Sequence, residues 1–474
     1  MVTGKQSPLS SGTRRISYAE LKRHYSYDDA WVAINGQVYD ITAFIPSHPF
    51  GDTFRGSLGS DCSGLFSASH AATAVEQQLK NPSFLAANGI RLVGQLDVSG
   101  DRLFKGNQGQ YLDRLVYRNS DDDPFWLDLR DRVNSYIKES GQTTHYTRHE
   151  GILYLIYYSF IFLILAYLAW IQASIVAALL LGIHLICAST NMAHMATHFG
   201  FTRIAALDFI AAHFFDLCGL SCLEWQIIHQ THHHQPHSCI DYQTNQYAPI
   251  RIHPYVRHRT HHRSQHIYFW LAIATYHIRT LVTSSLWLLQ HHHLVRHRRE
   301  YVAHTIARLI LFSCIVACGQ LHGLVSALLI FTSYSLACSY SAFLLLFNDH
   351  EDTHKVLAHS ADINSVHHQL SWAETQVRTS GNWQPSNWVL KFIEFHYGYF
   401  NYHIEHHLFP AFKPSLLKRL SPIVRQVCAD HGIPYISTSF MAMQRSFQRH
   451  LTTMAAQAAG VAEEHDSHAA TSIP

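Results

Sequence analysis

Three short stretches of the sequence, HMATH, HQTHH and HIEHH, carry histidines spaced three or four residues apart. On a helix this spacing places side chains on one face, so each stretch can direct its imidazoles toward one point. An all-nitrogen site with open coordination positions suits iron that must bind dioxygen. Three such helices are therefore expected to line one cavity that activates dioxygen. The predicted ligands are His194, His198, His229, His232, His233, His403, His406 and His407.

The chain has 39 histidines, so other spacings of the same kind arise and compete with these three stretches. HYTRH precedes the apolar part of the chain, and HRTHH lies among arginines that would repel a metal cation. His184 and His322 lie inside or between apolar segments and are interpreted as hydrogen-bonded packing or interfacial residues. Runs of three histidines exceed what helical geometry can direct to one point. The histidines left out of the site are His145, His149, His234, His258, His261, His262, His291, His292, His293 and His354.

Two pairs of apolar stretches separate the histidine clusters, at about 152–170 with 171–191 and at about 307–318 with 321–347. A membrane-spanning helix needs about 20 apolar residues. Because almost nothing separates the members of each pair, each pair is expected to be a helical hairpin whose two ends face the same side. Residues 267–289 are apolar but interrupted, which predicts a position at the membrane surface. Basic clusters in the connecting segments favour the cytosolic side for all long loops.

Residues 16–98 are predicted to form a small α+β domain. A capping-box pattern begins a helix at Ser17, and Asn35-Gly36 fits a hairpin turn between apolar strands. The domain carries His48 in SHPFGD and His70 in DCSGLFSASH. Haem iron in an electron carrier takes two axial imidazoles from opposite sides of a pocket, and this separation allows that arrangement. Two histidines on an ordinary surface are the alternative.

The expected fold class is a mostly α membrane protein. Two transmembrane helical hairpins would carry a cytosolic helical cap with the histidine stretches, behind the N-terminal α+β domain. The predicted divisions are 1–15 disordered, 16–98 the α+β domain, 99–145 a linker and amphipathic helix, 146–445 the membrane domain, and 446–474 a disordered tail. Nine cysteines, an odd number, are interpreted as reduced, and a net charge of +2 gives no reason to expect a nucleic-acid partner. The first 16 residues lack the apolar core of a signal peptide, so the N-terminus is expected in the cytosol.

The segments YAEL, WVAINGQVYDIT, SHPFGD, SASH and VGQL, in this order, resemble the cytochrome b5 fold over roughly eighty residues. That family usually has a glycine where this chain has Phe50, and the glycine lets the backbone turn tightly beside the haem. The histidine stretches resemble the boxes of membrane fatty acid desaturases and hydroxylases. Trp225, Pro236, RSQHIYF and the GIPY after NYHIEHHLFP resemble the front-end branch, in which a cytochrome b5 domain precedes the desaturase. That branch usually has glutamine in place of His403.

The resemblance implies front-end desaturation of a fatty acyl chain, carried as acyl-CoA or phospholipid. It implies two iron ions on the histidine boxes, haem b on His48 and His70, dioxygen as co-substrate and NADH-cytochrome b5 reductase as the upstream donor. A further iron ligand is implied at His350, with Asn348 holding a water as the alternative. The implied location is the endoplasmic reticulum membrane, with both termini cytosolic.

Two other kinds of function stay open at this point. One is a sphingoid-base desaturase or an acyl hydroxylase, since the same ligand set serves those reactions. The other is a non-catalytic haem protein or a metal transporter. A transporter is expected to place polar ligands inside its membrane spans, whereas these boxes are predicted at the cytosolic ends.

Overall fold

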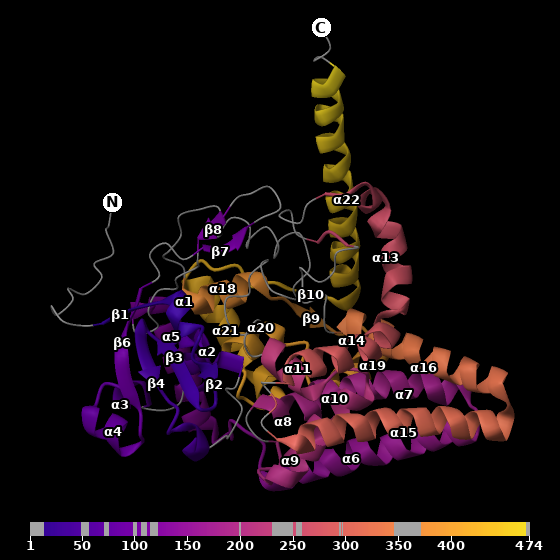
Figure 1. The fold of residues 1–474 in the computed structure, drawn as a ribbon, viewed down its shortest axis with the longest axis horizontal. Helices are drawn as coiled ribbons and strands as arrows, with labels where there is room; N and C mark the ends of the chain where they lie inside the picture. Colours follow the sequence, from indigo (N-terminus) through magenta and orange to yellow (C-terminus); the bar gives the residue numbers. More distant parts are fainter. Residues whose placement is uncertain are drawn as a thin grey trace.

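The structure, a computed structural model, describes residues 14–48, 56–70, 75–97, 102–105, 111–113, 122–198, 201–229, 250–252, 258–292, 295, 297–345 and 371–470. A sheet-containing N-terminal domain lies beside one end of a bundle of long helices (Figure 1). The predicted ligands His232, His233 and His350, together with Asn348 and Phe50, fall outside the described ranges.

A six-stranded sheet forms the frame of the N-terminal domain, in the order β1-β6-β4-β3-β2 with β5 paired to β3. Asn35 and Gly36 have φ of 49° and 77°, which a two-residue hairpin turn between β3 and β4 requires, so the predicted turn is confirmed. Ser17 caps the first helix by accepting from the N–H of Glu20 at 3.1 Å, also as predicted. The strands are β1 (Arg15–Ser17), β2 (Tyr25–Ser26), β3 (Asp29–Ile34), β4 (Gln37–Asp40), β5 (Ser60–Asp61) and β6 (Arg91–Asp97); the helices are α1 (Tyr18–Leu21), α2 (Ser63–Ser69), α3 (Val75–Gln78) and α4 (Pro82–Ala87).

The segment after this domain contains more regular structure than a linker. A short hairpin, β7 (Arg102–Lys105) with β8 (Tyr111–Asp113), occurs where only linker was predicted. The predicted helix comes next as α5 (Pro124–Ser140), which Asp123 caps by accepting from the N–H of Phe125 at 3.1 Å. Helix α5 packs on α21 (Pro414–Asp430), a helix from near the C-terminal end of the chain.

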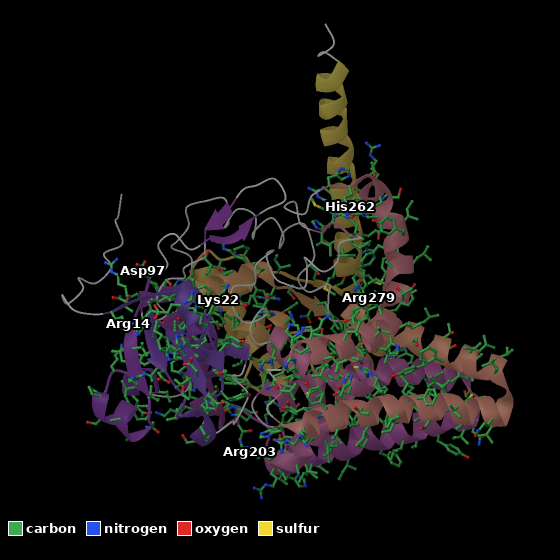
Figure 2. All side chains as sticks on the ribbon, in the orientation of Figure 1. Arg14, Lys22, Asp97, Arg203, His262 and Arg279 are labelled. Atoms are coloured by element: carbon green, nitrogen blue, oxygen red, sulfur yellow. The ribbon has the colours of Figure 1, made fainter. Side chains whose placement is uncertain are left out.

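Four helices are long and apolar enough to cross a membrane, which agrees with the four predicted spans. α7 and α16 are largely buried, whereas α6 and α15 expose most of their apolar side chains. Figure 2 shows mainly carbon side chains along α15 and α16, the kind of surface that lipid covers. The spans are Arg148–Ile171, which includes α6 (Arg148–Ala166); Ile175–His198, which includes α7 (Ile175–Ala188) and α8 (His194–His198); α15 (Arg298–His322); and α16 (Leu324–Leu345).

Shorter elements surround the long helices; some lie at the end that adjoins the N-terminal domain, whereas α13 (Gln265–Ala274) packs beside α22 (Phe440–Ala470), away from that domain (Figure 1). They include the third histidine stretch and adjoin His229, the described histidine of the second. In chain order they are α9 (Ala205–Ala212), α10 (Phe214–Leu217), α11 (Cys222–Ile228), α13 (Gln265–Ala274), α14 (Tyr276–Gln290), α18 (Trp372–Thr379), β9 (Asn382–Gln384), α19 (Trp388–His396), α20 (His403–Leu408), α21 and β10 (Ser437–Ser439).

The C-terminal segment differs from the expectation of disorder after residue 446. Helix α22 (Phe440–Ala470) continues through it. Phe447, Leu451 and Met454 are fully buried or nearly so, and Phe447 contacts Phe269 of α13 with ring centroids 5.1 Å apart. Their spacing of four and three residues is an apolar helix face, which the Ala-, Glu- and Ser-rich composition of the tail concealed.

Helix α7 packs so closely on α16 that only a glycine fits at position 182. A Cβ at Gly182 would lie 2.6 Å from the Cβ of Ala337 and 2.7 Å from the carbonyl oxygen of Tyr334. Without a hydrophobic force between helices in lipid, small residues promote association by letting backbones approach. This contact fixes α7, and α7 leads directly into the first histidine stretch.

Gly182→Ala is expected to destabilise the protein by about 1–3 kcal/mol, because the added methyl group overpacks this contact. The apparent Tm of detergent-purified protein, followed by size-exclusion chromatography after heating, should fall by a few degrees. Gly319→Ala is the matched control, since the nearest atom to its added Cβ is 3.7 Å away. Equal apparent Tm values for the two variants would contradict close packing of α7 on α16.

Candidate metal centre and haem site

Histidines from all three predicted stretches meet in one buried group. His194 and His198 lie on α8, His229 directly follows α11, and His406 lies on α20. The Nε2 atom of His194 is 2.5 Å from Nε2 of His229 and 3.0 Å from Nε2 of His198. Each of the four offers a ring nitrogen, and these nitrogens lie within 4.8 Å of one another. Converging imidazole nitrogens in a dry site are the donor set of a transition-metal centre.

A second pair of imidazoles adjoins this group on α20. The Nε2 atoms of His403 and His407 are 3.2 Å apart, and the ring of His403 is 5.7 Å from that of His406. Nδ1 of His407 lies 2.7 Å from Oε1 of Gln376 in α18. Because a carboxamide oxygen only accepts, Nδ1 carries the proton and Nε2 keeps its lone pair toward His403. A partner of this kind fixes the orientation and tautomer of a metal-binding histidine.

Glu405, between the histidines of the third stretch, anchors α20. Its carboxylate accepts from Nδ2 of Asn382 at 2.8 Å and from the hydroxyl of Tyr435 at 2.6 Å. Oδ1 of Asn382 in turn accepts from the N–H of Ile404 at 2.9 Å. Burial raises the pKa of Glu405 to about 7, and the hydrogen bonds from Tyr435 and Asn382 oppose that rise. The GIPY segment thus has a structural role, since its tyrosine helps hold the helix that carries three of the histidines.

Two aromatic rings pack directly against the imidazoles. Trp225 stacks on His229, with ring centroids 4.9 Å apart and planes 17° apart. Phe400 lies 4.5 Å, centroid to centroid, from both His194 and His406. These rings exclude water from one side of the group, which strengthens any electrostatic interaction there.

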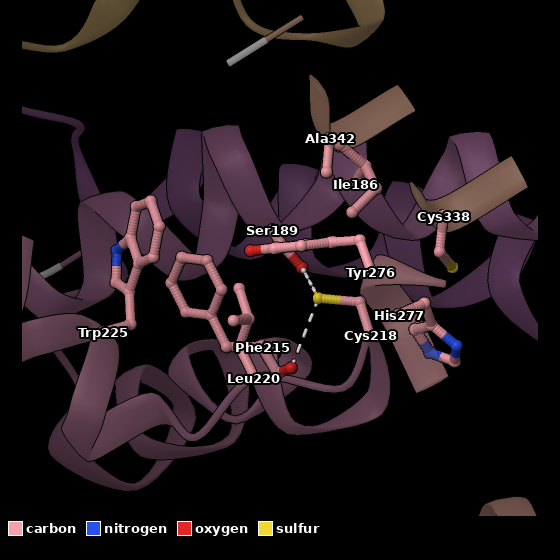
Figure 3. Close-up of a pocket in the computed structure, with 10 residues that line it drawn as sticks. All are labelled: Ile186, Ser189, Phe215, Cys218, Leu220, Trp225, Tyr276, His277, Cys338 and Ala342. Carbon is pink, nitrogen blue, oxygen red and sulfur yellow. Dashed lines mark hydrogen bonds between the residues drawn. The ribbon is translucent and has the colours of Figure 1, made fainter. Parts of the chain in front are cut away.

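Trp225 also lines an apolar pocket between the long helices (Figure 3). Two polar groups in its wall are hydrogen-bonded: the thiol of Cys218 donates to the carbonyl oxygen of Phe215 at 3.2 Å and lies 3.4 Å from Oγ of Ser189. The pocket is small, and it places an apolar surface beside the imidazole group. Its lining residues are Ile186, Ser189, Phe215, Cys218, Leu220, Trp225, Tyr276, His277, Cys338 and Ala342.

The two histidines of the N-terminal domain lie close together in space. His48 follows a short 3-10 helix (Ile45–Ser47), and His70 ends α2. Burial, and then the nearby His70, lowers the pKa of His48 to about 4, so its imidazole is neutral at neutral pH, the form that ligates metal. Nδ1 of His70 lies 2.8 Å from the carbonyl oxygen of Phe66, so Nε2 is the nitrogen that would ligate an iron. These residues fit two axial ligands of a haem iron.

Two histidines that were left out of the site have structural partners, and for His184 this is the hydrogen-bonded packing role expected from the sequence. Nδ1 of His184 is 2.9 Å from Nε2 of His396, and its Nε2 is 3.0 Å from the carbonyl oxygen of Tyr158. His262 is buried, and its Nδ1 accepts from the N–H of Arg259 at 3.0 Å. Neither residue belongs to the imidazole group described above.

Among the described residues, one further group has the composition of a metal site, formed by His213, Asp216 and Cys222. Sequence reasoning did not single it out. Asp216 is already engaged, because its Oδ1 is 2.5 Å from Nδ1 of His304 on α15 and its carbonyl oxygen accepts from Arg308. These contacts form a hydrogen-bond network that ties α10 to α15.

The fold and the site define a class of protein: four candidate membrane spans, a buried imidazole group at one end of them, and a small sheet domain with paired histidines. The family model for fatty acid desaturase matches residues 165–439, and the model for a cytochrome b5-like heme/steroid binding domain matches residues 17–87. The first match covers more than half of the 474 residues. This chain therefore belongs to the fatty acid desaturase family, and the predicted resemblance is confirmed.

Individual relatives agree with the family. The chain is 23% identical over 462 residues to an acyl-lipid (8-3)-desaturase of Physcomitrium patens, covering 92% of this chain and 91% of that one. It is 25% identical over 462 residues to an acyl-lipid (8-3)-desaturase of Mortierella alpina, covering 93% and 97%. The N-terminal domain is 39% identical over 72 residues to L-lactate dehydrogenase (cytochrome) of Saccharomyces cerevisiae, covering 15% of this chain and 12% of that one. No solved structure matches the chain.

Gln376→Leu is expected to lower iron affinity about ten- to hundredfold, because His407 loses the acceptor that orients its ring. Gln376→Glu retains an oxygen acceptor and should keep most of the iron. Iron per folded protein would be measured after competition with a chelator. Gln426→Leu is the control, since that amide is exposed on α21 and donates to Asp430 at 2.8 Å. Equal iron retention by the two leucine variants would remove Gln376 from the site.

Proposed function

We propose that this chain catalyses oxygen-dependent, front-end desaturation of a fatty acyl chain at a histidine-ligated di-iron centre. The observation that carries the proposal is the meeting of the three histidine stretches in one buried group, inside a domain of the desaturase family. The relatives' printed names, acyl-lipid (8-3)-desaturase and Delta(5) fatty acid desaturase, support an acyl substrate.

His194, His198, His229 and His406 would surround one iron position, and the adjoining pair of His403 and His407 would contribute to the second. Iron bound there would supply the oxidising power that, with dioxygen, removes hydrogen from an unactivated methylene group. The protein's own part is to hold the rings and exclude water. Gln376 orients His407, Glu405 fixes α20, and aromatic rings cover the group. His232, His233 and His350 are the further ligands proposed from the sequence.

The acyl chain would lie in a narrow apolar channel between the membrane helices, with its polar head at the cytosolic surface. The small apolar pocket beside Trp225 supports an apolar path toward His229, on which Trp225 stacks. A channel of fixed depth sets the distance from the head group to the metal, and that distance selects which carbon reacts. The front-end resemblance favours counting from the carboxyl end.

Electrons would come from haem b, held by His48 and His70 in the fused domain. A tethered donor acts at a high effective concentration, so no encounter between separate proteins is needed for this step. NADH-cytochrome b5 reductase is the proposed donor to the haem. The proposed location is the endoplasmic reticulum membrane, with two helical hairpins and both termini cytosolic. The four apolar helices support a membrane location of this kind.

Expression in a host that lacks polyunsaturated lipids, with lipid analysis by mass spectrometry after feeding candidate acids, tests the proposal. A new double bond near the carboxyl end is expected. A hydroxylated product, or a product restricted to sphingoid bases, would favour the acyl hydroxylase or the sphingolipid desaturase instead.

Single alanine substitutions of His194, His198, His229 or His406 should lower product at least a hundredfold, because an incomplete ligand set loses iron or misplaces dioxygen. Iron content and product would be measured in equal amounts of folded protein. His258→Ala and His291→Ala are controls that alter histidines outside the group. The ligand assignment is wrong if these two variants lose as much product as the site variants.

His403→Gln is expected to keep measurable desaturation, since a carboxamide oxygen also offers a lone pair to the metal. His403→Ala offers none and should lose both product and part of the iron. If His403 only packs between helices, the alanine variant will be less stable, yet the folded fraction will keep normal iron and normal turnover per iron. That result would remove His403 from the ligand set.

A further inference from the structure

The haem domain contacts the histidine-bearing domain through one face of α2. A Cβ at Gly64 would lie 2.3 to 2.5 Å from three atoms of the Trp372 ring. Ala68, one turn further along α2, is fully buried in the apolar cluster that contains Trp372 and Trp126. Residues four apart share a helix face, so these two small residues form one contact strip. Their size lets the indole rest directly on the helix backbone.

Both helices of this contact lead to candidate metal ligands. Helix α2 ends at His70, the proposed haem ligand. Helix α18 begins at Trp372, and Gln376 lies one turn further along it, where its Oε1 is 2.7 Å from Nδ1 of His407. Only a few covalent and hydrogen bonds therefore connect the contact between Gly64 and Trp372 to His70 on one side and to His407 on the other.

A second connection runs through aromatic rings. Trp372 meets Trp126 edge to face, with centroids 5.8 Å apart, and Trp126 stacks on Phe409 at 5.6 Å. Phe409 is two residues beyond His407 and is fully buried. Packed aromatic rings leave no gap between the contact and α20, and electron tunnelling slows steeply wherever it must cross empty space.

We propose that Gly64 and Ala68 against Trp372 form the docking contact through which the haem domain delivers electrons to the histidine cluster, with Trp372 as a positioning residue. This inference rests on the proposed function. In each transfer one electron leaves ferrous haem, which becomes ferric, and one ferric iron becomes ferrous. Two transfers per turnover, with two protons and the two hydrogens of the acyl chain, account for reduction of dioxygen to two waters.

A substitution at Gly64 can change docking without changing the folding of the haem domain. A glycine within a helix costs about 1 kcal/mol relative to alanine. The three atoms nearest to its Cβ position all belong to Trp372, and none belongs to the haem domain. A side chain added at this position therefore blocks the contact while the packing of the haem domain itself stays as it is.

Gly64→Leu in the full-length, iron- and haem-loaded protein tests the inference by stopped-flow spectroscopy. Haem is reduced first, and its reoxidation is followed after dioxygen and an acyl substrate are added. Gly64→Leu should slow reoxidation at least tenfold, with unchanged haem absorbance and iron content. Ala86→Leu adds the same bulk at an exposed position of α4, on the far side of the haem domain in Figure 1, and should match the wild type.

A cysteine pair, Gly64→Cys with Trp372→Cys, tests the contact without iron, haem or turnover. The pair should form a disulfide under mild oxidation, whereas neither single variant should, because the two positions lie within the reach of that bond. Absence of the cross-link, or wild-type reoxidation in Gly64→Leu, overturns the docking inference. If wild-type protein shows no iron-dependent haem reoxidation at all, the proposed function is wrong. Electron delivery through this contact is then also wrong.

Discussion

Six of the described histidines lie buried beside one another, and the surrounding structure must offset the free-energy cost of burying their rings. Each ring has an N–H that needs an acceptor and a lone pair that needs a proton or a cation, and a buried polar group without its partner costs about 1–3 kcal/mol. Lone pairs directed at a common point repel one another unless a cation lies between them. The convergence of ring nitrogens from His194, His198, His229 and His406 within 4.8 Å of one another fits a site built around a metal cation.

Each histidine stretch is held by a different kind of interaction. The first continues a buried helix through a π-helical turn, so its direction depends on the close packing of Gly182 on α16. The second is covered by Trp225, which stacks on His229. The third depends on the buried carboxylate of Glu405 and its partners Asn382 and Tyr435. If one of these three supports shifted, the histidines that it holds would move relative to the other two histidine stretches, because packed interiors do not deform smoothly.

Features that depend on local spacing could be predicted from the sequence. Histidines three and four apart indicated three converging helix faces, and long apolar runs indicated four helices. The supports Gln376, Asn382 and Tyr435 could not be predicted, because their hydrogen bonds join distant segments and leave no periodic pattern. The C-terminal helix is a different case, since the apolar spacing of Phe447 and Leu451 was present in the sequence but was outweighed by composition. Hydrogen-bond partners that are far apart in the sequence can be identified only once the fold is known. The C-terminal helix could have been predicted by giving apolar spacing more weight than composition.

The apolar pocket and the contact between the two domains lead to different histidines of the buried group. Trp225 links the apolar pocket to His229, whereas Trp372 and Gln376 link the haem domain to His407. These links use different helices, α11 on one side and α18 on the other. Under the proposed function, an acyl chain approaching His229 from the side of α11 would not disturb the N-terminal domain, because the two links share no helix. The apolar contact at α2 also holds the N-terminal domain, with its proposed haem ligands, against the helical region.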